Sequence, residues 1–204
     1  MANYVIILAA GKGKRLCTKL PKCFVTYKNK PIYYHCLKTF LAIKQIKKIV
    51  LVVPKPYKNK INQTKKIIVT IGGKTRNESF ENGLLALFNH LKLEDKVIVH
   101  DGARPNVTKQ DIAKIINSKL LFGTLCYKGS KNNVDLYLKH FNVQTPQFFI
   151  FWTYLLCLKP NPKGKDLFTY LNYSYTNKNF IESLSKQRNK KITYKNDLLD
   201  KFTS

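Results

Sequence analysis

Acidic residues are scarce in this sequence, and the first one comes late. Its 204 residues include 11 Asp and Glu against 37 Lys and Arg, so the formal net charge is +26, and no carboxylate precedes Glu78. A hydrophobic content of 44% excludes a disordered basic tail. The positive charge favours an anionic partner, which could be nucleic acid, an acidic membrane surface or a phosphorylated small molecule. Only four of the basic residues are arginine, and a codon bias toward lysine explains the excess equally well.

Cysteine motifs and long apolar runs are also lacking. The five cysteines form neither a CxxC pair nor a metal-like ladder with the four histidines, which favours reduced thiols in a cytoplasmic protein. The N-terminal apolar run has no basic segment before it, and the run from 148 to 158 is shorter than the ~20 residues that a bilayer span requires. We therefore expect no export signal and no membrane partner.

Apolar periodicity predicts an α/β fold. Short β-branched runs alternate with helical patterns, and strands are expected at 4–8, 48–53, 66–71, 96–100 and 124–127. Helices are expected at 32–41, at 76–91 behind a capping box of Thr75 and Glu78, and after Thr108. Nearly continuous apolar strands separated by helices indicate a Rossmann-like, mostly parallel twisted sheet with helices on both faces. In such sheets the ligand crevice lies beyond the carboxyl ends of the strands.

The loop after the first strand has the composition of a phosphate-binding loop. Gly11 and Gly13 let the backbone approach a ligand and present N–H groups to anionic oxygens. Four basic side chains lie close by, at Lys12, Lys14, Arg15 and Lys22. The loop is not a dinucleotide fingerprint, because Leu16 replaces a small residue and no acid follows ~20 residues later, and it lacks the GK[ST] ending of a Walker loop. A plain turn is the alternative.

Two further strand ends carry candidate ligand groups. The pair Gly72-Gly73 runs into a helix N-terminus, whose backbone amides suit a base edge or a phosphate. Asp101 follows the fourth strand, where its carboxylate could hold Mg²⁺ against nucleotide phosphates or could cap the following turn. His100 could be a base, but we favour a packed, hydrogen-bonded histidine at the end of a buried strand.

Together these segments resemble the 2-C-methyl-D-erythritol 4-phosphate cytidylyltransferase family of the nucleotide-diphospho-sugar transferase superfamily, whose close relatives are ribitol-5-phosphate cytidylyltransferases. The matching segments follow the family's order over nearly the whole chain: Ala9-Ala10-Gly11-x-Gly13-x-Arg15, Pro21-Lys22, Gly72-Gly73-x-x-Arg76-x-x-Ser79, Asn82-Gly83-Leu84, His100-Asp101-Gly102-Ala103-Arg104-Pro105, Gln144-Thr145-Pro146-Gln147 and, more weakly, Asn189-Lys190-Lys191-Ile192-Thr193. Each segment is short, but the combination is specific.

The resemblance implies a role for each matched residue. Arg15 and Lys22 would contact the triphosphate and stabilise the transition state, while Lys191 would hold the acceptor phosphate near the α-phosphorus. Asp101 would serve Mg²⁺, the implied cofactor, and Arg104 would reach an acceptor phosphate. The cytosine and ribose would lie against Ala10, Gly73 and Ser79. The remaining substrate-binding candidates are Ala9, Gly11, Gly13, Arg76, Tyr137 and Thr145.

The sequence departs from the family mainly on the acceptor side. Lys74 follows the glycine pair where the family often has an acid, and Tyr137 replaces an arginine that positions the acceptor. The stretch between Arg104 and Gln144 is shorter than in relatives. In the family this stretch forms an arm that is exchanged between subunits. With a shortened arm region, the acceptor's identity and homodimer formation both stay open.

The resemblance implies Mg²⁺-dependent transfer of CMP from CTP to a polyol phosphate, with 2-C-methyl-D-erythritol 4-phosphate as the expected acceptor in isoprenoid precursor synthesis. We expect one cytidylyltransferase-like nucleotide-binding domain over residues 1–204. The alternatives are ribitol 5-phosphate or another sugar or alcohol phosphate as acceptor, and a nucleotide-binding or RNA-binding protein without turnover. Basic side chains spread over every element, without an aromatic RNP-like motif, argue against a nucleic-acid partner.

Overall fold

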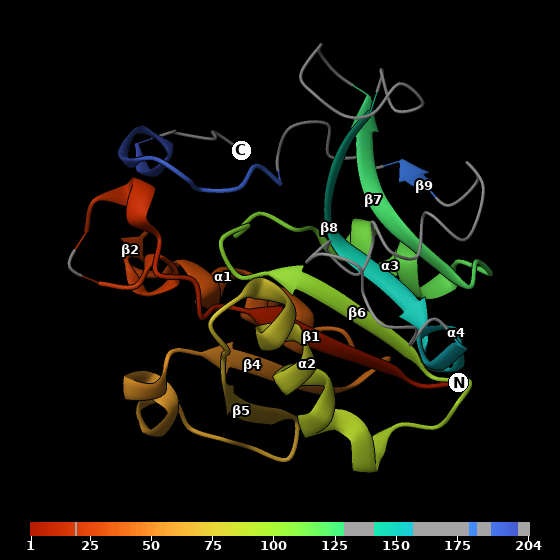
Figure 1. Cartoon of the computed structure of the whole chain (residues 1–204). Helices are drawn as coiled ribbons and strands as arrows, with labels where there is room; N and C mark the ends of the chain where they lie inside the picture. The colour runs from red at the N-terminus through yellow and green to blue at the C-terminus, as the bar shows by residue number, and fades with distance from the viewer. Residues whose placement is uncertain (19, 129–140, 157–179, 183–188, 200–204) are drawn as a thin grey trace.

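One twisted sheet organises the protein (Figure 1). The computed structural model describes residues 1–18, 20–128, 141–156, 180–182 and 189–199, with the backbone alone at 14, 126–128, 141–144, 155–156 and 180–182. Within these residues the strand order is β5-β4-β1-β6-β8-β7-β9. These strands are β1 (Asn3–Leu8), β4 (Ile46–Val53), β5 (Ile67–Ile71), β6 (Lys96–Asp101), β7 (Phe122–Lys128), β8 (Phe141–Ile150) and β9 (Phe180–Glu182). A separate ribbon pairs β2 (Thr26–Tyr27) with β3 (Lys30–Pro31).

The sheet is mostly parallel, as the apolar strands predict. Strands β5, β4, β1 and β6 run parallel, whereas β8 is antiparallel to both β6 and β7. All five expected strands are present within two residues of their expected bounds. Strand β8 was not expected, because Pro146 lies inside it and proline cannot donate to a sheet ladder.

Helices cover both faces of the sheet, as expected. On one face α1 (Ile32–Leu41) and α3 (Lys109–Asn117) pack against Val5 and Ile7 of β1. On the other face α2 (Arg76–Leu87) and α4 (Phe151–Leu156) pack against Tyr4 and Ile6. This alternation follows from the two-residue period of a strand. None of the described helices is both long and apolar enough to cross a membrane.

The start of α2 differs slightly from the expected capping box. The Thr75 hydroxyl accepts a hydrogen bond from the Glu78 N–H at 3.1 Å, as predicted. The Glu78 carboxylate, however, accepts from the Lys74 N–H at 2.7 Å, one residue before the cap. Helix α2 also ends earlier than the predicted residue 91, because the chain tightens into a 3₁₀ turn at Phe88–His90. Thr108 caps α3 as expected.

A buried lysine fixes α3 on the sheet. Lys96, the first residue of β6, has no exposed surface, and its ammonium donates hydrogen bonds of 2.8 to 3.0 Å to the carbonyls of Ile115, Ile116 and Ser118. These carbonyls belong to the end of α3, where a cation also complements the helix dipole. The contact anchors one end of the strand whose other end is Asp101.

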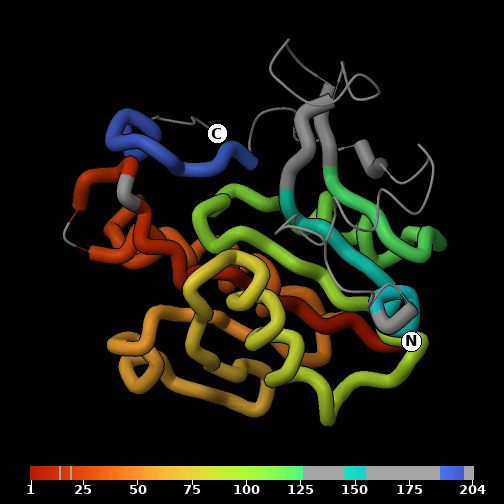
Figure 2. Tube along the Cα trace, in the orientation of Figure 1, coloured from red at the N-terminus to blue at the C-terminus, as the bar shows by residue number. Residues whose placement is uncertain are grey.

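The C-terminal segment lies beside the N-terminal loops (Figure 2). The side chain of Ile192 is buried with Leu16, Tyr27 and Ile32 in a small apolar cluster. The Ile192 N–H donates to the Ala103 carbonyl at 2.9 Å. Apolar burial and this hydrogen bond therefore bring the end of the chain to the loop that follows β6.

Candidate active site

Three loops meet where the parallel strands end. Backbone hydrogen bonds of 2.8 to 2.9 Å tie each loop to a neighbouring strand, from Ala9 to Val52, from Gly72 to Val53 and from Gly102 to Leu8. A Cβ atom on Gly72 would lie 2.2 Å from the Cβ of Ala10, so only glycine lets these two loops touch. The loop after β1 and the loop after β5 therefore share one surface.

Ser79 closes the glycine loop. Its hydroxyl donates to the Thr75 carbonyl at 2.8 Å and accepts from the Gly73 N–H at 3.1 Å, and the side chain is buried. The loop leads directly into the N-terminus of α2, where the helix dipole is positive. The expected base and ribose residues Ala10 and Gly73 thus lie in adjoining loops, and Ser79, in the first turn of α2, contacts the second of these loops.

Lys22 is packed against the first loop. Gly13 has a φ of +66°, and a Cβ there would lie 2.3 Å from the Cβ of Lys22. Burial, together with the positive charges of Lys191 and Arg15, lowers the pKa of the Lys22 ammonium to about 8. Such a shift is typical of functional sites, although structural charge clusters produce it too. The exposed Arg15 guanidinium lies 5.9 Å from the centre of the Tyr194 ring.

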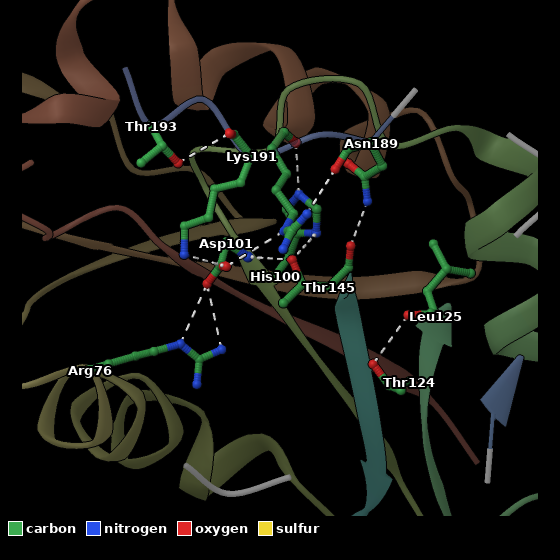
Figure 3. Close-up of polar contacts among 10 residues, drawn as sticks. Arg76, His100, Asp101, Thr124, Leu125, Thr145, Asn189, Lys191 and Thr193 are labelled. Atoms are coloured by element: carbon green, nitrogen blue, oxygen red, sulfur yellow. Dashed lines mark hydrogen bonds and ion pairs between the residues drawn. The ribbon is translucent and has the colours of Figure 1, made fainter. Parts of the chain in front are cut away.

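Asp101 faces three basic side chains (Figure 3). Its carboxylate is 2.9 Å from the Lys191 ammonium, 3.5 Å from Nε of Arg76 and 3.6 Å from Nε of Arg104. Burial alone would raise the pKa of the carboxyl, but these three cations outweigh it and hold that pKa well below its usual range. Asp101 is therefore ionised at neutral pH, and one carboxylate joins three parts of the chain.

Thr145 and His100 form hydrogen bonds that fix the backbone at Asp101. Nε2 of His100 lies 3.0 Å from the Arg104 carbonyl, which can only accept, so Nε2 carries the proton. Burial lowers the pKa of His100 to about 4, so the ring is neutral and Nδ1 accepts. The Thr145 hydroxyl therefore donates to Nδ1 at 3.3 Å while it accepts from the Asp101 N–H at 3.0 Å. This agrees with the favoured interpretation of His100 as a packed residue.

The Asp101 carboxylate can bind a hard divalent ion only if waters and substrate phosphates supply the other ligands. No cluster of three or more His, Cys, Asp or Glu side chains suited to a metal occurs in the described part of the chain. Magnesium commonly uses one carboxylate together with waters and substrate phosphates, and Asp101 can supply that oxygen. The three cations around Asp101 would repel a divalent ion that binds alone. The site therefore suits an ion that binds together with nucleotide phosphates.

The structure brings most of the expected residues to one edge of the sheet. Around Asp101 it gathers Arg76, Arg104, Thr145 and Lys191, and the first loop adds Ala9, Ala10, Gly11, Gly13, Arg15 and Lys22. Tyr137 and residues 129–140 of the shortened stretch between Arg104 and Gln144 lie outside the described residues. Asn189 received no role from the sequence, although it begins the segment that contains Lys191. This fold and this arrangement of loops define the nucleotidyltransferase class of α/β proteins.

Comparison with known sequences identifies the family. The family model for 2-C-methyl-D-erythritol 4-phosphate cytidylyltransferase (IspD) matches residues 3–123. A protein of that name from Thermosipho africanus is 37% identical over 148 residues, which cover 70% of this chain and 65% of that protein. One from Clostridium botulinum is 36% identical over 181 residues, which cover 76% and 75%. The chain belongs to the 2-C-methyl-D-erythritol 4-phosphate cytidylyltransferase family.

Solved structures agree with this assignment. The Francisella tularensis 2-C-methyl-D-erythritol 4-phosphate cytidylyltransferase superposes with a TM-score of 0.75 at 26% identity, covering 98% of this chain and 97% of that one. The bifunctional IspDF of Campylobacter jejuni gives a TM-score of 0.78 at 26% identity, with 98% of this chain matching 54% of the longer protein. The α/β fold expected from the sequence is confirmed.

The buried neutral His100 makes stability depend on pH. Its pKa of about 4 lies below the ordinary 6.5, so between these values the unfolded chain binds a proton that the folded protein excludes. The free energy of unfolding of the wild type should therefore fall by roughly 3 kcal/mol more than that of His100→Gln as the pH drops across this window. Denaturant titrations at several pH values measure this difference. If the free energies of unfolding of the two proteins change with pH in parallel, His100 is not a buried neutral residue. His90 is exposed, so His90→Gln is the control and should follow the wild type.

Proposed function

We propose that this protein is a Mg²⁺-dependent cytidylyltransferase that transfers CMP from CTP to 2-C-methyl-D-erythritol 4-phosphate and releases pyrophosphate. One observation carries the proposal: Lys191, Arg76 and Arg104 converge on Asp101 at the sheet edge beside two glycine loops. Membership of the family supports the choice of both substrates. Residues 1–204 would form one domain that carries this activity.

The nucleotide would lie across the first two loops. The exposed backbone of Gly11 has open space around it, and the Ala10 and Gly73 loops adjoin it. Together with Ser79 these groups would hold the base and ribose, while Ala9 and Gly13 shape the loop. Arg15 and Lys22 would then face the triphosphate. Arg15 directly precedes Leu16, and Lys22 lies between Leu16 and Tyr27, the two residues of this loop region that pack with Ile192.

The acceptor would lie near the C-terminal segment. Lys191 and Arg104 would hold its phosphate, with Thr145 behind them, and Tyr137 is a further candidate for acceptor binding from the sequence alone. The acceptor phosphate is already charged, so its oxygen can attack the α-phosphorus in line while the bond to pyrophosphate breaks. No general base is required, consistent with a neutral His100 whose two ring nitrogens are both engaged.

Catalysis would therefore depend on alignment and on fixed positive charge. Nucleotidyltransferases of this family generally depend on a divalent metal. Bound beside Asp101, Mg²⁺ would neutralise charge that develops on the phosphates. Lys191, Arg76 and Arg104 would transfer part of their contact from the carboxylate to the arriving anions. The charge of the three cations would thus be available to the substrates without any change of protonation.

The proposed reaction is tested by incubating the purified chain with CTP, Mg²⁺ and 2-C-methyl-D-erythritol 4-phosphate. Pyrophosphate and the CDP ester of methylerythritol should appear in equal amounts, and ATP in place of CTP should give far less. A parallel reaction with ribitol 5-phosphate tests the alternative acceptor. If the folded protein releases no pyrophosphate with either acceptor, the proposed function is wrong.

Lys22→Ala should reduce kcat/KM for CTP by about two to three orders of magnitude, because it removes a charge aimed at the triphosphate. In the wild type, kcat/KM should fall as the pH rises above about 8, where the Lys22 ammonium loses its proton. Steady-state rates from pH 6 to 10 measure both effects. Lys30→Ala removes an exposed lysine and should change neither. A near-normal rate for Lys22→Ala would refute the assigned role.

A further inference from the structure

A buried amide connects the C-terminal segment to the sheet. Asn189 is 1% exposed, and its side-chain Nδ2 donates a hydrogen bond to the Thr145 carbonyl on β8. Its own carbonyl accepts from Nη1 of Arg104 at 3.0 Å. Asn189 thus contacts both Thr145 and Arg104, which lie next to Asp101. Its own side chain is too buried to reach a substrate.

These contacts close a ring of hydrogen bonds around the end of β6 (Figure 3). Asn189 donates to Thr145, and the Thr145 hydroxyl accepts from the Asp101 N–H and donates to His100. His100 then donates to the Arg104 carbonyl, and the Arg104 side chain returns to Asn189. Because the donor and acceptor of each link are determined, the ring defines one arrangement of these segments.

Lys191 depends on this ring for its position. Its side chain is 38% exposed and has a flexible four-carbon stem, so packing does not hold the ammonium at Asp101. The backbone on either side is held instead, by Asn189 two residues before it and by the Ile192 N–H one residue after it. The Lys191 Nζ then reaches Oδ2 of Asp101 at 2.9 Å.

Stability alone does not account for an amide at position 189. Its Oδ1 atom is buried and has no hydrogen-bond partner among the described residues. A buried acceptor without a partner is unfavourable, and an apolar side chain of similar shape would avoid this cost. The retained benefit is the directional bond from Nδ2 to Thr145, which fixes geometry.

We propose that Asn189 is a positioning residue that sets Lys191 and Arg104 at the acceptor side of the site by tying the C-terminal segment to β8 through Thr145. The proposal rests on the proposed function in assigning Lys191 to the acceptor phosphate. It predicts that the loss of the Nδ2 donor acts on turnover and on acceptor binding, and leaves CTP binding nearly unchanged.

Kinetics of Asn189→Ala and Asn189→Asp test this prediction. Aspartate keeps the size of the side chain and, in its ionised form, cannot donate to Thr145, so assays above its pKa separate the hydrogen bond from simple packing, and it provides a second variant if alanine does not fold. Both should lower kcat by about 10- to 100-fold and raise KM for the acceptor, with KM for CTP within about twofold of the wild type. Asn196→Ala, an exposed asparagine in the same segment, is the matched control and should behave as wild type.

A double-mutant cycle shows whether Asn189 acts through Lys191. If it does, Asn189→Asp should lower kcat by a clearly smaller factor in a Lys191→Ala background than in the wild type, with the remaining loss acting through Arg104. A purely structural role would instead give additive losses, or a loss that matches only the unfolded fraction in a thermal melt. Wild-type kcat for either Asn189 variant, or full additivity, would overturn the proposal.

Chemical labelling makes the outcome independent of the enzyme assay. Limited acetylation followed by mass spectrometry should modify Lys191 faster in folded Asn189→Asp than in the wild type, because the ion pair with Asp101 is loosened, while the exposed Lys195 reacts equally in both. Faster labelling in a protein without cytidylyltransferase activity would retain the positioning role and reject the proposed function. Unchanged labelling of Lys191 in the folded variant would reject the positioning role.

Discussion

Attraction between one carboxylate and three cations holds the candidate active site together. Lys191 comes from the C-terminal segment, Arg76 from the first turn of α2 and Arg104 from the loop after β6, and all three lie within 3.6 Å of Asp101. Solvent screens these pairs weakly because the carboxylate is buried. The site therefore carries an excess of positive charge at a fixed place. Anionic phosphates are the ligands that such a place favours.

Local patterns were sufficient to predict much of the fold. The β-branched runs of β1, β4 and β6 are long and buried on both sides, so their apolar character identifies them without tertiary information. Strand β8 could not be found this way, because Pro146 breaks the usual strand pattern and the pairing with β6 and β7 is long-range. Helix α2 was predicted to end at residue 91 but ends at Leu87, because the chain then tightens into a 3₁₀ turn. Apolar periodicity does not detect such a change.

Candidate site residues could be predicted from the sequence where their charge suggests a role. Residues whose role depends on tertiary contacts could not be predicted in this way. Asp101 follows a strand and Lys22 belongs to a basic, glycine-containing loop, so residue type alone indicated phosphate chemistry there, whereas Arg76 was assigned through the family resemblance. Asn189 was matched to a family segment but received no role, since its contribution depends on burial and on a partner 44 residues away in the sequence. The scarcity of acids gained a meaning as well. With no carboxylate before Glu78, Arg15 and Lys22 have no acidic neighbour on their own stretch of chain, and any protein carboxylate for a metal ion must come from later in the sequence, where Asp101 lies at a strand end.

The ionisation of Asp101 in the substrate-free protein is the most direct test of this account. A ¹³C NMR titration of the Asp101 carboxyl should show it still ionised as the pH falls through 3.8, its ordinary pKa, because Lys191, Arg76 and Arg104 stabilise the charged form. In Lys191→Met the midpoint should move upward. A midpoint near 3.8 or above in the wild type would contradict the claim that this carboxylate organises the site.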